Sequence, residues 1–127
     1  MKKEEREEAA LLGIEEILEK TKALTQLLKN TESYRRYILH LERLEANPEV
    51  CRKLNAFRRK NLELQMRLDA ADYYEKTDAL QREYKDILME PAVMDFLTSE
   101  QTVCRILRLV YNELAEEMEL DISYMDE

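Results

Sequence analysis

The sequence predicts an all-α fold, a multi-helix bundle of about five helices arranged as two stacked helical hairpin units. One Gly and two Pro in 127 residues leave few positions for turns, since ordinary usage is roughly 7% and 5%. Good helix formers such as Leu, Glu, Lys and Arg are abundant. Asn47-Pro48-Glu49-Val50 recurs 43 residues later as Glu90-Pro91-Ala92-Val93. Each Pro precedes a long apolar-periodic segment, and Pro fits the first turn of a helix.

Two helices are predicted before Pro48. The first has the 3,4 apolar spacing of an amphipathic helix, on a face with Leu11, Ile14, Leu18, Thr21, Leu24 and Leu28. Thr31 or Ser33 then supplies an N-cap. The second helix ends near Ala46, because the residue before a proline resists helical geometry. Its inner face is predicted to carry Tyr34, Tyr37, Ile38, Leu41 and Leu44.

The third predicted helix is the most regular, because its apolar positions alternate in steps of four and three, as in a heptad seam. The series is Val50, Leu54, Phe57, Asn61, Leu64, Leu68 and Ala71. Two interpretations of the polar member stay open. Asn61 either fixes the register between packed helices or lies solvated at the edge of the seam.

Two more helices complete the prediction. A new 4,3 series, Tyr73, Thr77, Leu80, Tyr84 and Ile87, is out of phase with the previous one. It favours a turn near Asp69–Asp72, capped by an Asp, over one continuous helix. The fifth helix carries Val93, Phe96, Leu97, Val103, Leu107, Val110, Leu114 and Met118, with Glu100 interrupting the stripe. One domain spanning 1–127 is expected, with residues 1–10 and 121–127 loose at its ends.

The net charge of −8 is unevenly distributed. Residues 1–50 carry a net −2, residues 51–67 a net +5 and residues 68–127 a net −11. A basic helix within an acidic chain indicates charge complementarity, either with the chain's own acidic helices or with a partner. Nucleic acid is the weaker partner class, since the pI near 4.9 is unlike that of typical nucleic-acid-binding domains.

Enzymatic chemistry finds little support in the residues. His40 is the only histidine, and Gly13 alone provides no phosphate-binding loop. The carboxylates are distributed along predicted helix faces, so we expect no catalytic residue, no metal site and no cofactor. Cys51 and Cys104 are isolated and are expected to be free thiols in a reducing compartment. The acidic start is unlike a secretory signal and no apolar run is long enough to cross a membrane, so a cytoplasmic location is expected.

These helix boundaries and spacings resemble the YlbF/YmcA family of small bacterial regulators, over roughly residues 14–120. The matching positions are Asn47, Pro48, Val50, Phe57 and Gln65, then Leu80, Pro91, Val93, Phe96 and Glu100, with Leu107 and Leu114 downstream. The resemblance implies an all-helical, self-associating, non-enzymatic regulator. Relatives support competence, sporulation and biofilm formation in Gram-positive bacteria, within a complex tied to an RNA-degrading endonuclease. Some are linked to iron–sulfur clusters, but neither Cys51 nor Cys104 matches a ligand motif.

The sequence therefore favours an adaptor that binds other proteins and forms a homodimer or larger assembly. The candidate contact residues lie on the basic helix: Arg52, Arg58, Arg59 and Lys60. Arg suits this role because its guanidinium pairs with carboxylates in a bidentate manner. Two alternatives are a helical nucleic-acid binder that uses the basic helix 51–67, and an iron–sulfur or metal carrier that shares cysteines within an oligomer.

Overall fold

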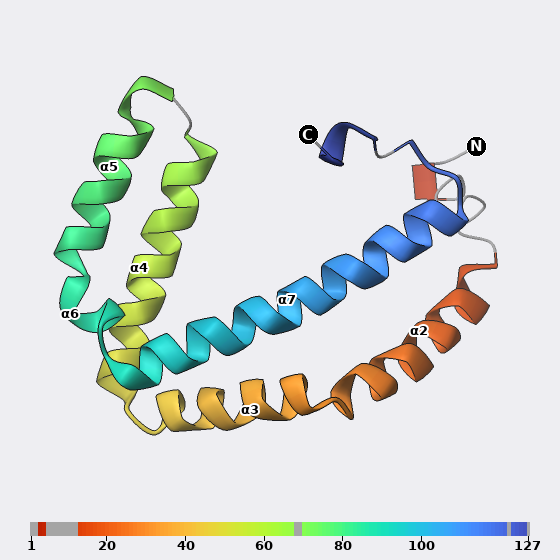
Figure 1. The fold of residues 1–127 in the computed structure, drawn as a ribbon, viewed down its shortest axis with the longest axis horizontal. Helices are drawn as coiled ribbons and strands as arrows, with labels where there is room; N and C mark the ends of the chain where they lie inside the picture. The colour runs from red at the N-terminus through yellow and green to blue at the C-terminus, as the bar shows by residue number, and fades with distance from the viewer. Residues whose placement is uncertain (1–2, 5–12, 68–69, 122, 127) are drawn as a thin grey trace. The chain divides into compact units, whose positions relative to one another are not determined.

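The computed structural model describes residues 3–4, 13–67, 70–121 and 123–126. Across these residues it contains α-helices, one short 3₁₀ helix and no strand, so the predicted all-α class is confirmed (Figure 1). Contacts divide the chain into an N-terminal unit, residues 1–35, and a C-terminal unit, residues 36–127. The expectation of one domain over 1–127 stays a prediction.

The N-terminal unit contains helix α2 (Ile14–Lys29), which begins after Gly13 at φ 90°. The backbone N–H of Asn30 donates to the carbonyls of Gln26 and Leu27 and ends the helix. Thr31 is the N-cap of the next helix, because its Oγ1 accepts a hydrogen bond from Tyr34 N–H at 3.3 Å. The structure thus selects Thr31 over Ser33. The prediction for Leu11 and most of residues 1–10 falls outside the described residues.

In the part of the chain that the structure describes, five further α-helices follow, with the labels of Figure 1. They are α3 (Glu32–Glu45), α4 (Pro48–Met66), α5 (Ala70–Glu83), α6 (Lys85–Leu88) and α7 (Pro91–Glu117), before the 3₁₀ helix η1 (Ser123–Asp126). The fourth helix predicted from sequence is two helices here, because the chain turns at Tyr84. The break before α5 falls between Met66 and Ala70, slightly earlier than predicted, and a capping role for Asp69 lies outside the described residues.

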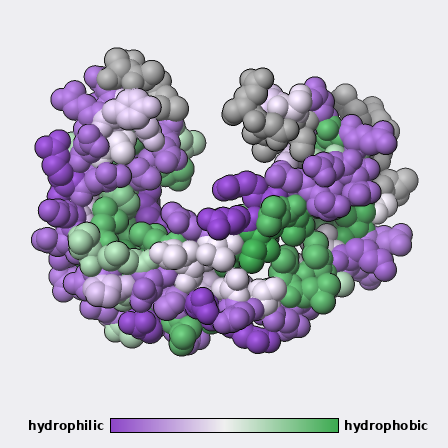
Figure 2. Space-filling view, viewed as in Figure 1, coloured by the Kyte–Doolittle hydropathy of each residue, from purple (hydrophilic) through white to green (hydrophobic). Residues whose placement is uncertain are grey.

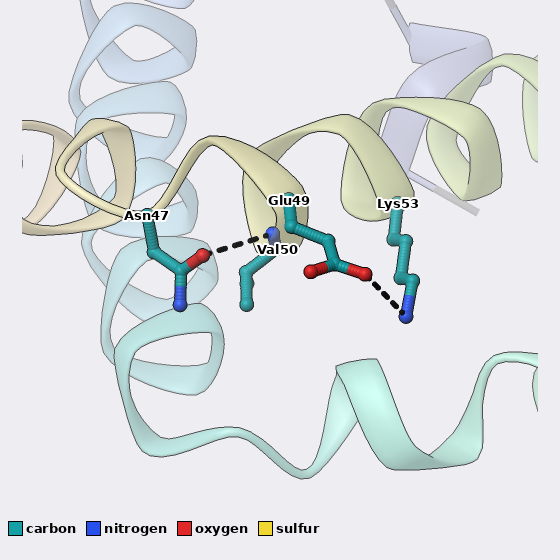
Figure 3. A network of polar contacts seen from close by, with 4 residues as sticks. All are labelled: Asn47, Glu49, Val50 and Lys53. Carbon is teal, nitrogen blue, oxygen red and sulfur yellow. Dashed lines mark hydrogen bonds and ion pairs between the residues drawn. The ribbon is translucent and has the colours of Figure 1, made fainter.

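Both prolines occupy the first turn of a helix, as predicted. The two helix starts nevertheless differ. Asn47 Oδ1 accepts a hydrogen bond from Val50 N–H at 3.4 Å, and Glu49 pairs with Lys53 one turn further at 3.5 Å (Figure 3). Glu90 precedes α7 in an extended conformation and makes no side-chain cap. The side-chain capping device is therefore present at the first copy of the repeat and not at the second.

Removing the Asn47 cap should destabilise the protein. For Asn47→Ala we expect the free energy of unfolding to fall by about 1 kcal/mol, because the Val50 N–H loses its side-chain acceptor. Asn47→Asp, which keeps an acceptor and adds negative charge at the helix N-terminus, should unfold at or above the wild-type urea midpoint. Equal midpoints for the alanine and wild-type proteins would show that the cap contributes nothing.

The core of the C-terminal unit joins three helices. Leu44 of α3, Leu54 of α4, and Val93 and Phe96 of α7 form one buried cluster. Half-buried residues surround it: Tyr37, Leu41, Val50, Cys51, Phe57, Ile87, Leu88 and Leu97. Helix α4 also packs against α5 and α6, where the Phe57 and Tyr84 rings lie 5.6 Å apart. Hydrophilic side chains cover much of the visible surface of α4 and α5 (Figure 2).

Candidate functional site

Helix α4 presents two chemically different faces. One face packs inside the C-terminal unit through Leu54, which is fully buried, and Phe57. The other lines an open groove of about 1040 Å³. The groove is lined by the last residue of α3 and by residues of α4: Glu45, then Pro48, Cys51, Arg52, Asn55, Arg58, Arg59, Asn61, Leu62 and Gln65. This exposed side of the basic helix is the candidate site.

Three cations of the basic helix are paired inside the protein. Arg58 Nη2 lies 2.6 Å from Glu100 Oε2 of α7, and its Cζ lies 5.6 Å from the centre of the Phe96 ring. Lys60 lies 3.5 Å from Glu83 of α5. Lys53 pairs with Glu49 on its own helix. Charge complementarity within the chain thus accounts for half of the six basic residues of 51–67.

Lys60 is tied to α5 and to the Tyr84 turn. Its Nζ lies 5.1 Å from the centre of the Tyr84 ring. The pKa of Lys60 is raised above its ordinary value, and the interaction with the Tyr84 side chain is the largest cause. Desolvation opposes this rise, and the negative charge of Glu83 adds to it. Since the ammonium is solvent-exposed, this raised pKa marks a persistent positive charge rather than a large contribution to stability.

Arg52 and Arg59 are different, because neither makes a hydrogen bond or ion pair with any residue that the structure describes. They lie seven positions apart, so they share one side of α4. Both line the groove together with Cys51, Asn55 and the 56%-exposed Leu62. We call these five residues the α4 outer face. It combines two unpaired guanidinium groups, which favour carboxylates, with an apolar side chain that can contact a packed helix.

The structure therefore separates the four candidate residues. Arg52 and Arg59 line the open groove and have no ion-pair partner among the described residues. Arg58 and Lys60 each have an internal ion-pair partner. Sequence reasoning missed Asn55 and Leu62 as groove residues. Together with Arg52 and Arg59 they follow a 3,4 spacing on the side of the helix opposite the heptad seam. This second periodicity in the sequence could have indicated that the four residues share one face.

Asn61 lies at the border between the two sides of α4. It is half-buried, lines the groove, and makes no side-chain hydrogen bond with the described residues. These observations agree with a position at the edge of the seam. They give no support to a register-fixing amide pair inside the unit.

Residues able to hold a metal are scattered in the described part of the chain, where no three His, Cys, Asp or Glu side chains form a ligand group. Cys51 and Cys104 are free thiols on different helices. His40 lies half-buried on α3, and its Nδ1 is buried without a hydrogen-bond partner among the described atoms. None of the described helices combines the length and apolar character needed to span a bilayer.

Fold and site together define a small all-α protein in which two arginines without an internal partner among the described residues line an open groove. The sequence model of the family described as "Control of competence regulator ComK, YlbF/YmcA" matches residues 17–119. The chain belongs to this family of regulators, as its helix boundaries predicted. It is also similar to the UPF0342 protein STH1710 of Symbiobacterium thermophilum, with 22% identity over 104 residues that cover 80% of this chain and 93% of the relative. No solved structure matches the chain.

Proposed function

We propose that this protein is a non-enzymatic, cytoplasmic regulatory adaptor that acts by binding another protein through the α4 outer face. The observation that carries the proposal is the division of the basic helix into paired and unpaired cations. Arg58 and Lys60 hold α4 to α7 and α5. Arg52 and Arg59 have no such role in the described part of the chain and line an open groove.

The chemistry of the α4 outer face specifies the partner. Two arginines seven residues apart are separated by about 10 Å along the helix axis, at 1.5 Å per residue. Carboxylates spaced by two turns on an amphipathic helix would meet both guanidinium groups, and an apolar side chain between or beyond them would contact Leu62. We therefore propose an acidic amphipathic helix of another protein as the ligand, with membership in a regulatory family as the second support.

Self-association into a homodimer or larger assembly is part of the same proposal. A complex tied to an RNA-degrading endonuclease, within competence, sporulation or biofilm control, is the setting that the family resemblance favours. Direct binding of RNA through the basic helix is the competing possibility. Partner capture and the salt dependence of RNA affinity distinguish protein binding from RNA binding.

Charge reversal at both unpaired arginines should abolish partner capture. We expect Arg52→Glu/Arg59→Glu to retain wild-type helicity and unfolding midpoint, because neither side chain is paired within the described structure. Recovery of wild-type partners from cytoplasm of the source cell should fall at least tenfold by quantitative mass spectrometry, mostly through a slower association rate. Lys20→Glu/Lys22→Glu on α2, which makes the same change in net charge, is the matched control and should recover partners normally.

The alternatives give different results. Full partner recovery by a folded Arg52→Glu/Arg59→Glu protein would rule out the α4 outer face as the binding surface. Loss of folding in that variant would show that these arginines serve the chain's own acidic helices. A wild-type affinity for RNA that decreases steeply between 50 and 200 mM salt would instead support the nucleic-acid binder, since phosphate contacts release counterions.

A further inference from the structure

Glu100 interrupts the apolar stripe of α7, and its ion-pair partner is Arg58 of the basic helix α4. Glu100 Oε2 lies 2.6 Å from Arg58 Nη2, and the two side chains are 27% and 41% exposed. A partly exposed ion pair contributes little to stability, because water already solvates both charges well. The clearer effect of this pair is geometric, since it fixes the place of the Arg58 guanidinium.

A second contact with α7 holds the same guanidinium. Arg58 Cζ lies 5.6 Å from the centre of the Phe96 ring, which is 2% exposed and belongs to the core. In the part of the chain that the structure describes, one guanidinium nitrogen of Arg58, Nη2, makes a hydrogen bond. A guanidinium group has several further N–H donors. Arg58 also lines the open groove, so these donors are available at its edge.

Helix geometry places this edge opposite the two unpaired arginines. Successive residues of an α-helix are offset by about 100° around its axis. Leu62 follows Arg59 by three residues and Arg58 by four, so it lies between these two arginines around the helix. Arg52 lies seven residues before Arg59 and therefore shares its flank of the groove. The groove thus has a cation on each side of its exposed leucine.

We propose that Arg58 is a binding residue on this second flank of the groove, where it takes a carboxylate of the partner helix while Nη2 stays on Glu100. The inference rests on the proposed function and deepens it, because the partner then carries carboxylates on both flanks of its apolar ridge. Charge complementarity supports this choice. As far as the structure describes the groove, its lining has three arginines against the single carboxylate of Glu45, and Glu100 is not part of it.

Two synthetic helical peptides measure this contact by fluorescence anisotropy. Both carry Glu at positions i and i+7, for Arg52 and Arg59, and Leu at i+4. Positions i+1 and i+8 lie on the other flank of the leucine. They are Glu in the two-flank peptide and Gln in the one-flank peptide, which has a similar helix propensity. We expect the wild-type protein to bind the two-flank peptide about threefold more tightly, as for one partly exposed ion pair.

An exchange of the two charges tests Arg58 without removal of its ion pair. Arg58→Glu/Glu100→Arg keeps the pair and the net charge but places a carboxylate at the groove edge. The preference should reverse, so that the one-flank peptide binds more tightly, because like charges repel. The matched control, Arg43→Asp/Asp95→Arg, exchanges an ion pair between α3 and α7 whose residues do not line the groove. It should keep the wild-type preference.

Arg58→Gln keeps the test decisive even where the exchange variant does not fold. It removes the cation and breaks a partly exposed ion pair, so its urea midpoint should stay close to that of the wild-type protein. We expect this variant to lose the preference for the two-flank peptide. Circular dichroism and urea unfolding show for each protein whether a changed affinity accompanies a changed fold.

Each contrary result has a separate meaning. Equal affinity of the wild-type protein for the two peptides overturns the role of Arg58 but leaves Arg52 and Arg59 as the binding surface. A folded Arg58→Glu/Glu100→Arg or Arg58→Gln protein that still prefers the two-flank peptide also overturns it, because the preference then arises elsewhere. Failure of both peptides to bind the wild-type protein overturns the acidic helix of the proposed function, and this inference with it.

Discussion

Phe96→Ala should lower the free energy of unfolding by about 3–5 kcal/mol, the usual range for removal of a buried phenylalanine. Phe96 is 2% exposed and belongs to the core of the C-terminal unit. Its ring lies 5.6 Å from the ring of Tyr37 and beneath the Arg58 guanidinium. The substitution therefore leaves a cavity between α3, α4 and α7 and also removes two contacts specific to an aromatic ring.

Thermal and urea unfolding followed by circular dichroism would measure this effect. Because a small domain is stable by about 5–15 kcal/mol in total, the variant should melt at least 10 °C lower or be partly unfolded at 25 °C. Met94→Ala is the matched control. Met94 lies two residues away on α7 and is 48% exposed, so its truncation should change stability far less. Similar losses for the two variants would mean that Phe96 does not anchor the core.

Leu54→Ala should be the second most damaging single change, with an expected loss of about 2–5 kcal/mol. Leu54 is 0% exposed and joins α4 to the α3 and α7 core residues. The neighbouring helices cannot fill the lost volume without moving, so a cavity and lost contacts both contribute.

Leu62 provides the control on the same helix. It is 56% exposed in the α4 outer face, so Leu62→Ala should leave the unfolding midpoint within experimental error and should reduce partner capture. This pair of variants separates stability from binding. A large loss of stability in Leu62→Ala would show that the outer face of α4 is buried in the folded protein, which contradicts its proposed role as a contact surface.

Helix content and helix starts could be predicted because they depend on local chemistry. Pro48 and Pro91 restrict the backbone at the first turn, and Thr31 caps α3 with its own side chain. The division of the fourth predicted helix at Tyr84 was not predictable in this way. No Gly or Pro marks that position. The Tyr84 ring contacts the tilted Phe57 ring and the Lys60 ammonium, and both contacts are made with another helix.

The candidate site could be predicted as a charged helix but not as a surface. Sequence gives the six cations of residues 51–67, and their spacing shows that Arg52 and Arg59 share a side. Which cations are already paired depends on distant residues such as Glu83 and Glu100. Their approach to α4 is set by the packing of α5 and α7, which no local pattern encodes.

The order in which the core is synthesised has a consequence for the newly made chain. Leu44 and Leu54 are translated well before Val93 and Phe96, the residues that cover them. Arg58 likewise precedes its ion-pair partner Glu100 by 42 residues. At the usual elongation rate of about 5–20 residues per second, this interval lasts about 2–8 s. During that time α3 and α4 leave the ribosome with their apolar sides uncovered, so the nascent chain offers chaperones a binding segment until α7 emerges.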